Sequence, residues 1–186
     1  MMEWFFGRPA LSRTGYAGRV RRRFAPSLTR PAARNHAVHA IDGVVTIMAT
    51  AEEQLPAGLL QGSSLRGGEY AWPIEDIPKV IEAARLENLA SVGGQLQFRI
   101  PDGGTCECYW IEIDPTAGLS PDLPWAERVS LTAERSLAAF QNLRSQFDFI
   151  EEGRKAFASH LDKYEAEGGD LNQVMCFVWY LENGPN

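Results

Sequence analysis

The residues of this chain with the clearest chemical potential are two cysteines one position apart, Cys106 and Cys108. On an extended strand both thiols lie on one face, where they could bind a metal ion or supply a nucleophile. A structural metal site needs about four ligands, and a cysteine nucleophile needs a base. The three histidines, His36, His39 and His160, all stand far from the pair in the sequence. We therefore expect buried structural cysteines, with no metal and no cofactor.

Carboxylates are the second group that could do chemistry, because two of them suffice for glycoside hydrolysis. The chain has 24 acidic residues, so pairs arise by chance, and we interpret them as solvated surface. The glycine pairs Gly67-Gly68 and Gly93-Gly94 lack the spacing of nucleotide-binding loops. The sequence shows no motif for a catalytic centre, and we expect the protein not to be an enzyme.

Charge is divided unevenly along the 186 residues. Residues 1–47 carry eight Arg against two acids, a net charge of +6, and have no sustained hydrophobic period. Residues 48–186 carry ten basic and 22 acidic residues, a net charge of −12. We expect 1–47 to be a disordered basic tail or a mis-assigned start, with translation beginning at Met48. Residues 48–186 are expected to form a single domain.

Composition also limits the classes of partner and the cellular compartment that we expect. An acidic domain repels nucleic acid and favours a cationic partner. Three cysteines are an odd number, which argues against a secreted disulfide scaffold, so we expect a cytoplasmic protein. No apolar run approaches the roughly 18 residues that span a bilayer, so we expect no membrane partner.

Hydrophobic spacing predicts the elements that position these groups. It predicts a helix over 77–88, followed by a turn at Gly93-Gly94. Strict alternation predicts a half-buried strand over 95–100, which a Pro-Asp-Gly-Gly turn joins to a more buried strand over 105–113. Further helical stripes follow Thr132, the predicted N-cap of the next helix.

These elements predict an α+β fold. Its small antiparallel sheet contains the hairpin 95–113 and a third strand over 173–181, packed against two or three helices. Four aromatic residues belong to this unit: Trp72, Tyr109, Trp110 and Trp125. Trp and Tyr are ordinary core residues and are also enriched at binding hot spots, so both roles remain open.

The block from about residue 59 to 145 resembles immunity protein 40 of bacterial polymorphic toxin systems. The likeness rests on the segments 70–76, 91–96, 109–114 and 125–142. The first opens a helix, the second enters a strand through two glycines, and the third ends a strand with aromatic and acidic residues. The family pattern leads us to expect an acidic residue after the two glycines. Gln95 occupies that position here and departs from the pattern.

The resemblance implies a cytoplasmic protein that binds and neutralises a cognate toxin domain, and an acidic surface suits a basic toxin. The residues expected to contact the toxin are Trp72, Trp110, Glu112 and Asp114. The alternative is an interaction or homo-oligomeric module without catalysis, using the same aromatics and an edge strand. A small enzyme would need a cleft with converging ionisable groups. The activity of the toxin and the oligomeric state stay open.

Overall fold

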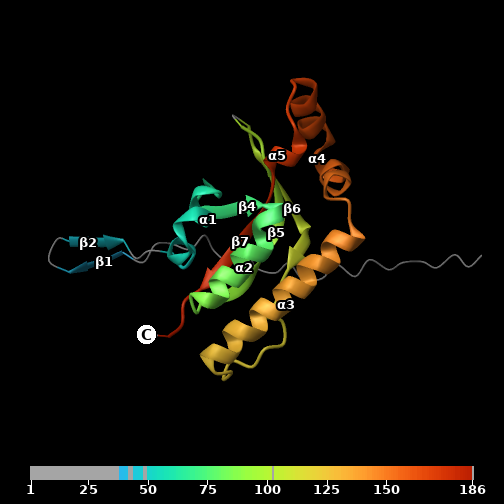
Figure 1. Ribbon diagram of the computed structural model, residues 1–186. Helices are drawn as coiled ribbons and strands as arrows, with labels where there is room; N and C mark the ends of the chain where they lie inside the picture. The colour runs from blue at the N-terminus through green and yellow to red at the C-terminus, as the bar shows by residue number, and fades with distance from the viewer. Residues whose placement is uncertain (1–37, 42–43, 48–49, 102, 186) are drawn as a thin grey trace, which may run out of the picture. The chain divides into compact units, whose positions relative to one another are not determined.

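The computed structural model describes residues 50–101 and 103–185, together with the backbone of residues 38–41 and 44–47 (Figure 1). Strands β1 (Val38–Ile41) and β2 (Val44–Ile47) pair antiparallel as a hairpin. They fall inside the segment that we expected to be a disordered tail. The rest of residues 1–47 and the expected start at Met48 lie outside the described residues.

A five-stranded antiparallel sheet forms the centre of the domain, in the order β3-β4-β7-β5-β6. Its strands are β3 (Ser64–Arg66), β4 (Glu69–Pro73), β5 (Ala90–Arg99), β6 (Thr105–Ile113) and β7 (Met175–Glu182). The α+β class and the predicted hairpin, which is β5–β6, are confirmed. The predicted third strand is β7, which lies between β4 and β5 in the middle of the sheet.

Helices cover one face of this sheet. The helical elements are η1 (Glu52–Gln54), α1 (Ala57–Gln61), η2 (Ile74–Asp76), α2 (Ile77–Leu86), α3 (Trp125–Gln146), α4 (Phe149–Ala166) and α5 (Leu171–Val174). α2 and α3 lie side by side and both pack on β5, and α4 contacts β5 and β6 (Figure 1). Among the described residues, no helix is long and apolar enough to cross a membrane.

The starts of two helices show where local sequence predicts a helix boundary and where it does not. α2 begins at Ile77 as predicted, because proline is tolerated in the first turn, where Pro78 lies. α3 begins at Trp125, not after Thr132, so the predicted N-cap is wrong. Thr132 is buried inside the helix, where its hydroxyl accepts a hydrogen bond from the backbone N–H of Ser91. A threonine can resemble a cap in sequence and yet connect a helix to a strand.

The core lies between the helices and the sheet. Its largest fully buried side chains include Trp72, Phe98, Phe140, Phe177 and Trp179. The segment before α1 contributes Ala51 and Leu55, which are also buried in this cluster. The carboxylate of Glu52 accepts the backbone N–H of Leu181 at 2.8 Å, which fixes this segment to β7.

Burial along the hairpin is the reverse of our expectation. β5 is buried on both faces: Gln97 is 0% exposed and Arg99 6% exposed, although both lie opposite to the core-facing Phe98. β6, which we expected to be the more buried strand, exposes Tyr109, Trp110 and Glu112 in its second half. The reason is strand order, because β5 lies between β7 and β6, whereas β6 is the edge of the sheet.

Two arginines stabilise the face that the helices leave uncovered. Arg99 donates to the carbonyl oxygens of Ser64 at 2.6 Å and Glu69 at 3.1 Å, and to the side chain of Gln97 at 3.0 Å. Arg66 donates to the carbonyl oxygens of Ile100 at 3.2 Å and of a glycine in the following turn. β3 and β5 are separated by two strands in the sheet order, so these bonds require the sheet to curl. Burial lowers the pKa of the Arg99 guanidinium.

The glycine pair Gly93-Gly94 lies inside β5, not in a turn before it. Gly93 has φ of 134°, and a Cβ there would lie 2.1 Å from the carbonyl oxygen of Ile113. A Cβ on Gly94 would lie 2.0 Å from the carbonyl oxygen of Val178. Both neighbouring strands therefore approach β5 more closely than any side chain would allow. The turn itself is at Asn88, which has φ of 57°.

Candidate partner-binding site

The candidate site lies on β6. The pairing of this strand with β5 is interrupted, since Gln95 pairs with Glu112 while the next residue, Leu96, pairs with Cys108. Residues 109–111 therefore form a bulge with no paired residue opposite. A bulge bends a strand and re-aims its side chains, which lets an edge strand expose residues that regular pleating would bury.

The bulge exposes two aromatic side chains, Tyr109 (66% exposed) and Trp110 (37% exposed). The ring of Trp110 stacks on Phe157 of α4, with centroids 6.2 Å apart and planes at 18°. Tyr109 meets Trp110 edge-on at 5.4 Å. The indole N–H of Trp110 donates a 3.1 Å hydrogen bond to Glu152 Oε2. One ring face and the N–H are thus engaged, so Trp110 is held in a defined orientation with part of the ring free.

Glu152 is the residue that orients Trp110. It is only 7% exposed, and its other carboxylate oxygen forms an ion pair with the exposed Lys155. A buried carboxylate needs compensation of this kind, because desolvation of an unpaired charge is costly. Glu152 therefore positions the indole and offers little free charge to a partner.

α4 presents Glu152 from the segment before a kink and Phe157 from the kink itself. Phe157 itself has non-helical backbone angles, φ −125° and ψ 22°. Arg154 spans the kink by ion pairs with residues on both sides, which are Glu151, Asp162 and Glu165. This cluster fixes the bend and hence the surface on which Trp110 stacks.

The two cysteines of β6 lie in the core beneath these aromatics, and both are free thiols. Burial, with smaller contributions from Cys106 and Glu152, raises the pKa of the Cys108 thiol to about 12. Burial likewise raises the pKa of Cys106. Both groups are therefore protonated at neutral pH, and thiols in that state are poor nucleophiles and poor metal ligands. Among the described residues, no three His, Cys, Asp or Glu side chains form a metal-binding group.

The structure separates the four residues that we expected to contact a partner. Trp72 is 0% exposed and donates its indole N–H to the carbonyl oxygen of Leu59, so it is a core residue and leaves the candidate surface. Trp110 lies on the helix side of β6. Glu112 is exposed and pairs with Gln95, which places it on the opposite face of the strand.

Asp114 lies just past the end of β6 and is also exposed. One of its oxygens accepts both the N–H of Thr116 at 2.9 Å and its hydroxyl at 2.7 Å, which forms a local turn. The side chain of Glu112 has no hydrogen bond or ion pair with any described residue. The site is thus an edge, with the indole of Trp110 on one side and the free carboxylate of Glu112 on the other.

Three contributors were absent from our sequence-based set: Tyr109, Glu152 and Phe157. Tyr109 was recognised as part of the aromatic group, but the bulge that exposes it gives no signal in the sequence. Glu152 and Phe157 are five positions apart on a helix whose distance from β6 only the fold reveals. No protein-family model, curated protein or solved structure matches this chain.

Proposed function

We propose that this chain is a small immunity-type protein that binds a basic toxin domain and neutralises it. The observation that carries the proposal is the oriented, partly exposed Trp110 at a sheet edge that also bears free carboxylate. Aromatic side chains held in place contribute to binding at low entropic cost, and Trp and Tyr are the most frequent hot-spot residues.

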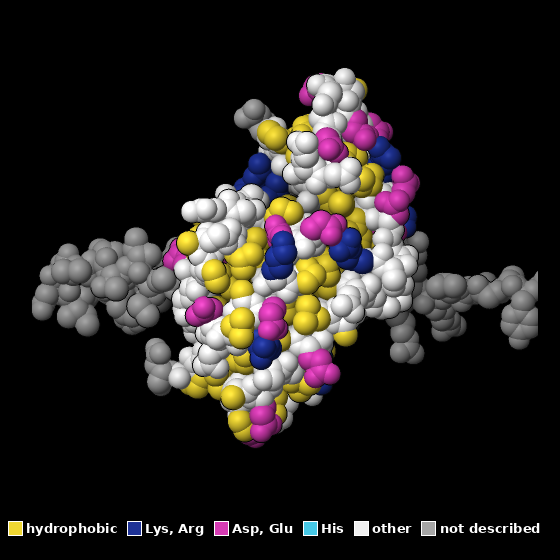
Figure 2. Space-filling view, in the orientation of Figure 1, with side chains coloured by type: hydrophobic (Ala, Val, Ile, Leu, Met, Phe, Trp, Pro, Cys, Tyr) yellow, Lys and Arg dark blue, Asp and Glu magenta, His cyan; other side chains and the backbone are white. Residues whose placement is uncertain are grey.

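Charge supports a cationic partner. Within the described residues, six cations pair with carboxylates: Lys79, Arg85, Arg144, Arg154, Lys155 and Lys163. Four more donate to backbone carbonyl oxygens: Arg66, Arg99, Arg128 and Arg135. The acidic excess is therefore not neutralised within the domain. Over α2 and α3, by contrast, blue and magenta side chains lie next to one another, which matches the ion pairs there (Figure 2).

The geometry favours an extended partner segment along β6. Within the described chain, β6 pairs with β5 alone, so its outer edge is open to another strand. An added strand projects alternate side chains to the two faces. One set would reach Trp110 on the helix side, and the other would reach Glu107 and Glu112.

A second copy of the chain is a less suitable partner for this edge. Antiparallel pairing of β6 with itself would bring Glu107 and Glu112 of both copies onto neighbouring strands, and like charges in such positions are destabilising. Catalysis also finds little support here, because Glu112 and Glu152 lie on opposite sides of β6 and do not converge on a cleft.

The test is co-expression with the toxin-encoding gene beside the gene for this protein, scored by survival of the cells. Wild type is expected to protect. Trp110→Ala and Glu112→Lys are expected to weaken binding of the purified toxin domain, the former by about 2 kcal/mol or roughly thirtyfold in Kd. Matched controls on α2 and after it, Leu86→Ala and Glu87→Lys, should bind as wild type does. Circular dichroism and thermal melts check that each variant folds.

The outcomes separate the parts of the proposal. If no toxin gene neighbours this one, or if wild type fails to protect, the immunity function is refuted. If wild type protects and both β6 variants bind unchanged, the function stands and the interface lies elsewhere. A stable dimer in light scattering that Glu112→Lys disrupts would favour the homo-oligomeric alternative.

A further inference from the structure

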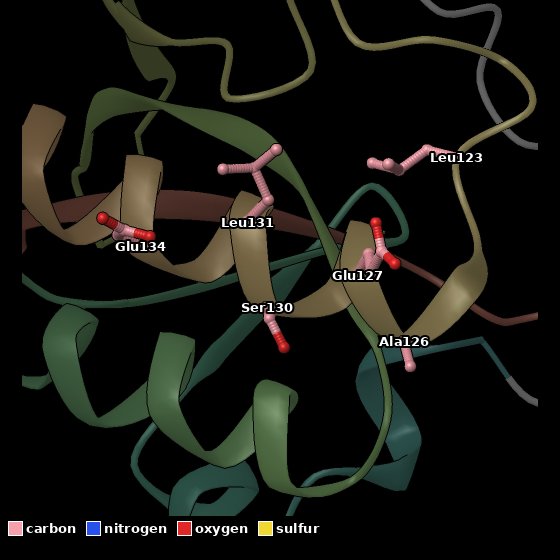
Figure 3. Close-up of a pocket in the computed structure, with 6 residues that line it drawn as sticks. All are labelled: Leu123, Ala126, Glu127, Ser130, Leu131 and Glu134. Carbon is pink, nitrogen blue, oxygen red and sulfur yellow. The ribbon is translucent and has the colours of Figure 1, made fainter.

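A second surface carries free carboxylates at a hollow. The hollow has a volume of about 460 Å³ and lies along the first half of α3, beside the loop that precedes it (Figure 3). Its lining residues are Leu123, Ala126, Glu127, Ser130, Leu131 and Glu134. Leu123 extends from the loop toward Leu131, while Glu127, Leu131 and Glu134 follow one another along the helix (Figure 3).

The loop that forms one wall of the hollow is held against α3 by hydrogen bonds. Arg128 donates to the carbonyl oxygen of Ser120 at 3.1 Å, and Arg135 donates to those of Pro115 at 3.2 Å and Ala117 at 3.0 Å. Both arginines bind the loop to α3, so the loop residue that overhangs the hollow is held in place. A preformed wall reduces the entropic cost of binding.

The same bonds leave the carboxylates of the hollow without cations. Arg128 follows Glu127 and Arg135 follows Glu134 in the sequence, yet both arginines point to the loop. Neither the Glu127 nor the Glu134 side chain forms a hydrogen bond or an ion pair with a described residue, and both residues are exposed. Two free acids therefore flank an apolar centre, which is complementary to a ligand with two cations flanking an apolar group.

The spacing identifies the shape of that ligand. Glu127 and Glu134 are seven positions apart on the helix, which corresponds to about 10 Å along the axis at 1.5 Å per residue. Same-face residues on a strand are about 6.6 or 13 Å apart, because the strand rises about 3.3 Å per residue. Two cationic residues seven positions apart on a helix match the separation of Glu127 and Glu134. Residues three or four positions after the first cation lie between the two cations on the same face of that helix.

We propose that this hollow is a docking groove for an amphipathic basic helix of a protein partner. Two Lys or Arg side chains one heptad apart bind Glu127 and Glu134, and a leucine between them packs between Leu123 and Leu131. This groove is distinct from the β6 edge, and the proposal does not depend on the toxin-binding function.

The probe is an alanine-based helical peptide with two Arg seven residues apart and two Leu between them, labelled with fluorescein. A peptide with Gln in place of both Arg is its control. Binding to the full chain is measured by fluorescence anisotropy. Each exposed ion pair contributes a few-fold to affinity, so the Glu127→Gln, Glu134→Gln double variant is expected to bind about tenfold more weakly. A matched variant with two other unpaired carboxylates changed, Glu87→Gln with Glu182→Gln, should bind as wild type does.

Methyl NMR locates the contact, since the signals of Leu123 and Leu131 should shift on titration with the Arg peptide. Trp110→Ala should leave the affinity for this peptide unchanged. The proposal is overturned if the Arg peptide fails to bind or binds no better than the Gln peptide. It is also overturned if the two double variants weaken binding equally, because the attraction would then reflect net charge rather than this groove.

Discussion

Gly153 on α4 offers a sharp test of how the candidate site is positioned. A Cβ built on Gly153 would lie 2.4 Å from Phe98 Cε2, 2.8 Å from Phe98 Cζ and 3.1 Å from Leu161 Cδ1. α4 therefore packs on β5 at a distance that only glycine permits. The residues before and after it in the helix, Glu152 and Phe157, hold Trp110, so this close packing also sets the position of the exposed indole.

The magnitude follows from two opposed effects of Gly153→Ala. Replacing glycine by alanine inside a helix stabilises the fold by about 0.5–1 kcal/mol. Overpacking a filled core costs about 1–3 kcal/mol. Because Phe98 is fully buried and cannot move into solvent, we expect the second effect to exceed the first. The net result is a destabilisation of about 1–2 kcal/mol.

A second substitution, at Phe98, should reverse the sign of the stability change that Gly153→Ala causes. Phe98→Leu removes the two ring atoms that the new methyl group would meet. In that background Gly153→Ala should be neutral or stabilising by up to about 1 kcal/mol, which gives a coupling energy of about 2 kcal/mol. Urea titrations of the four proteins of the cycle measure it. A stabilising Gly153→Ala in the wild-type background, or equal effects in both backgrounds, would show that α4 is not pressed against Phe98.

Further predictions concern the thiols, the buried arginine and the N-terminal segment. Replacing Cys106 and Cys108 together by Ala should leave partner binding unchanged; lost binding with the fold intact would contradict a purely structural role. Because burial raises the pKa of Cys108 from 9.0 to about 12, its stabilising contribution is complete below pH 9 and is lost toward pH 12, so this variant should show a shallower alkaline loss of unfolding free energy than wild type. Arg99→Met should destabilise by about 2 kcal/mol in urea, because buried carbonyl oxygens lose their donor. A protein that starts at Met48 keeps Ala51 and the rest of the described core, so its melting temperature should match that of the full chain; a large drop would mean that the removed segment packs.

The sequence predicts those parts of the fold in which periodicity is strong. α2 follows from apolar residues at helical spacing. The β5–β6 hairpin follows from the alternation over 95–100 and the Pro-Asp-Gly-Gly turn that leads into a second β-rich segment. β3 and β4 were missed because they have only three and five residues, and the single apolar residue of β3, Leu65, is exposed. Gly93-Gly94 was assigned to a turn because paired glycines are frequent in turns. In this fold they instead permit the close approach of the neighbouring strands.

Burial was less predictable than secondary structure, because it depends on the order of strands. Gln97 and Arg99 alternate with apolar residues, which predicts a solvent-facing side. They are buried because β7, far along the chain, pairs with β5, and because β3 curls over this face. Long-range pairing of this kind has no local sequence signal. The same applies to the candidate site, where sequence could not distinguish the core Trp72 from the exposed Trp110.

The distribution of cations gives a physical reason for the acidic surfaces of this domain. Arg66, Arg99, Arg128 and Arg135 all donate to backbone carbonyl oxygens, where a guanidinium can bridge several acceptors at once. These arginines connect loops and edge strands to the core, so they are unavailable to neighbouring carboxylates. The structural use of arginine thus leaves free carboxylates at two places with fixed geometry, the β6 edge and the α3 groove. Charge of this kind acts mainly on the rate of encounter, so association with a basic partner should slow as salt rises, while the loss of Trp110 should mainly speed dissociation.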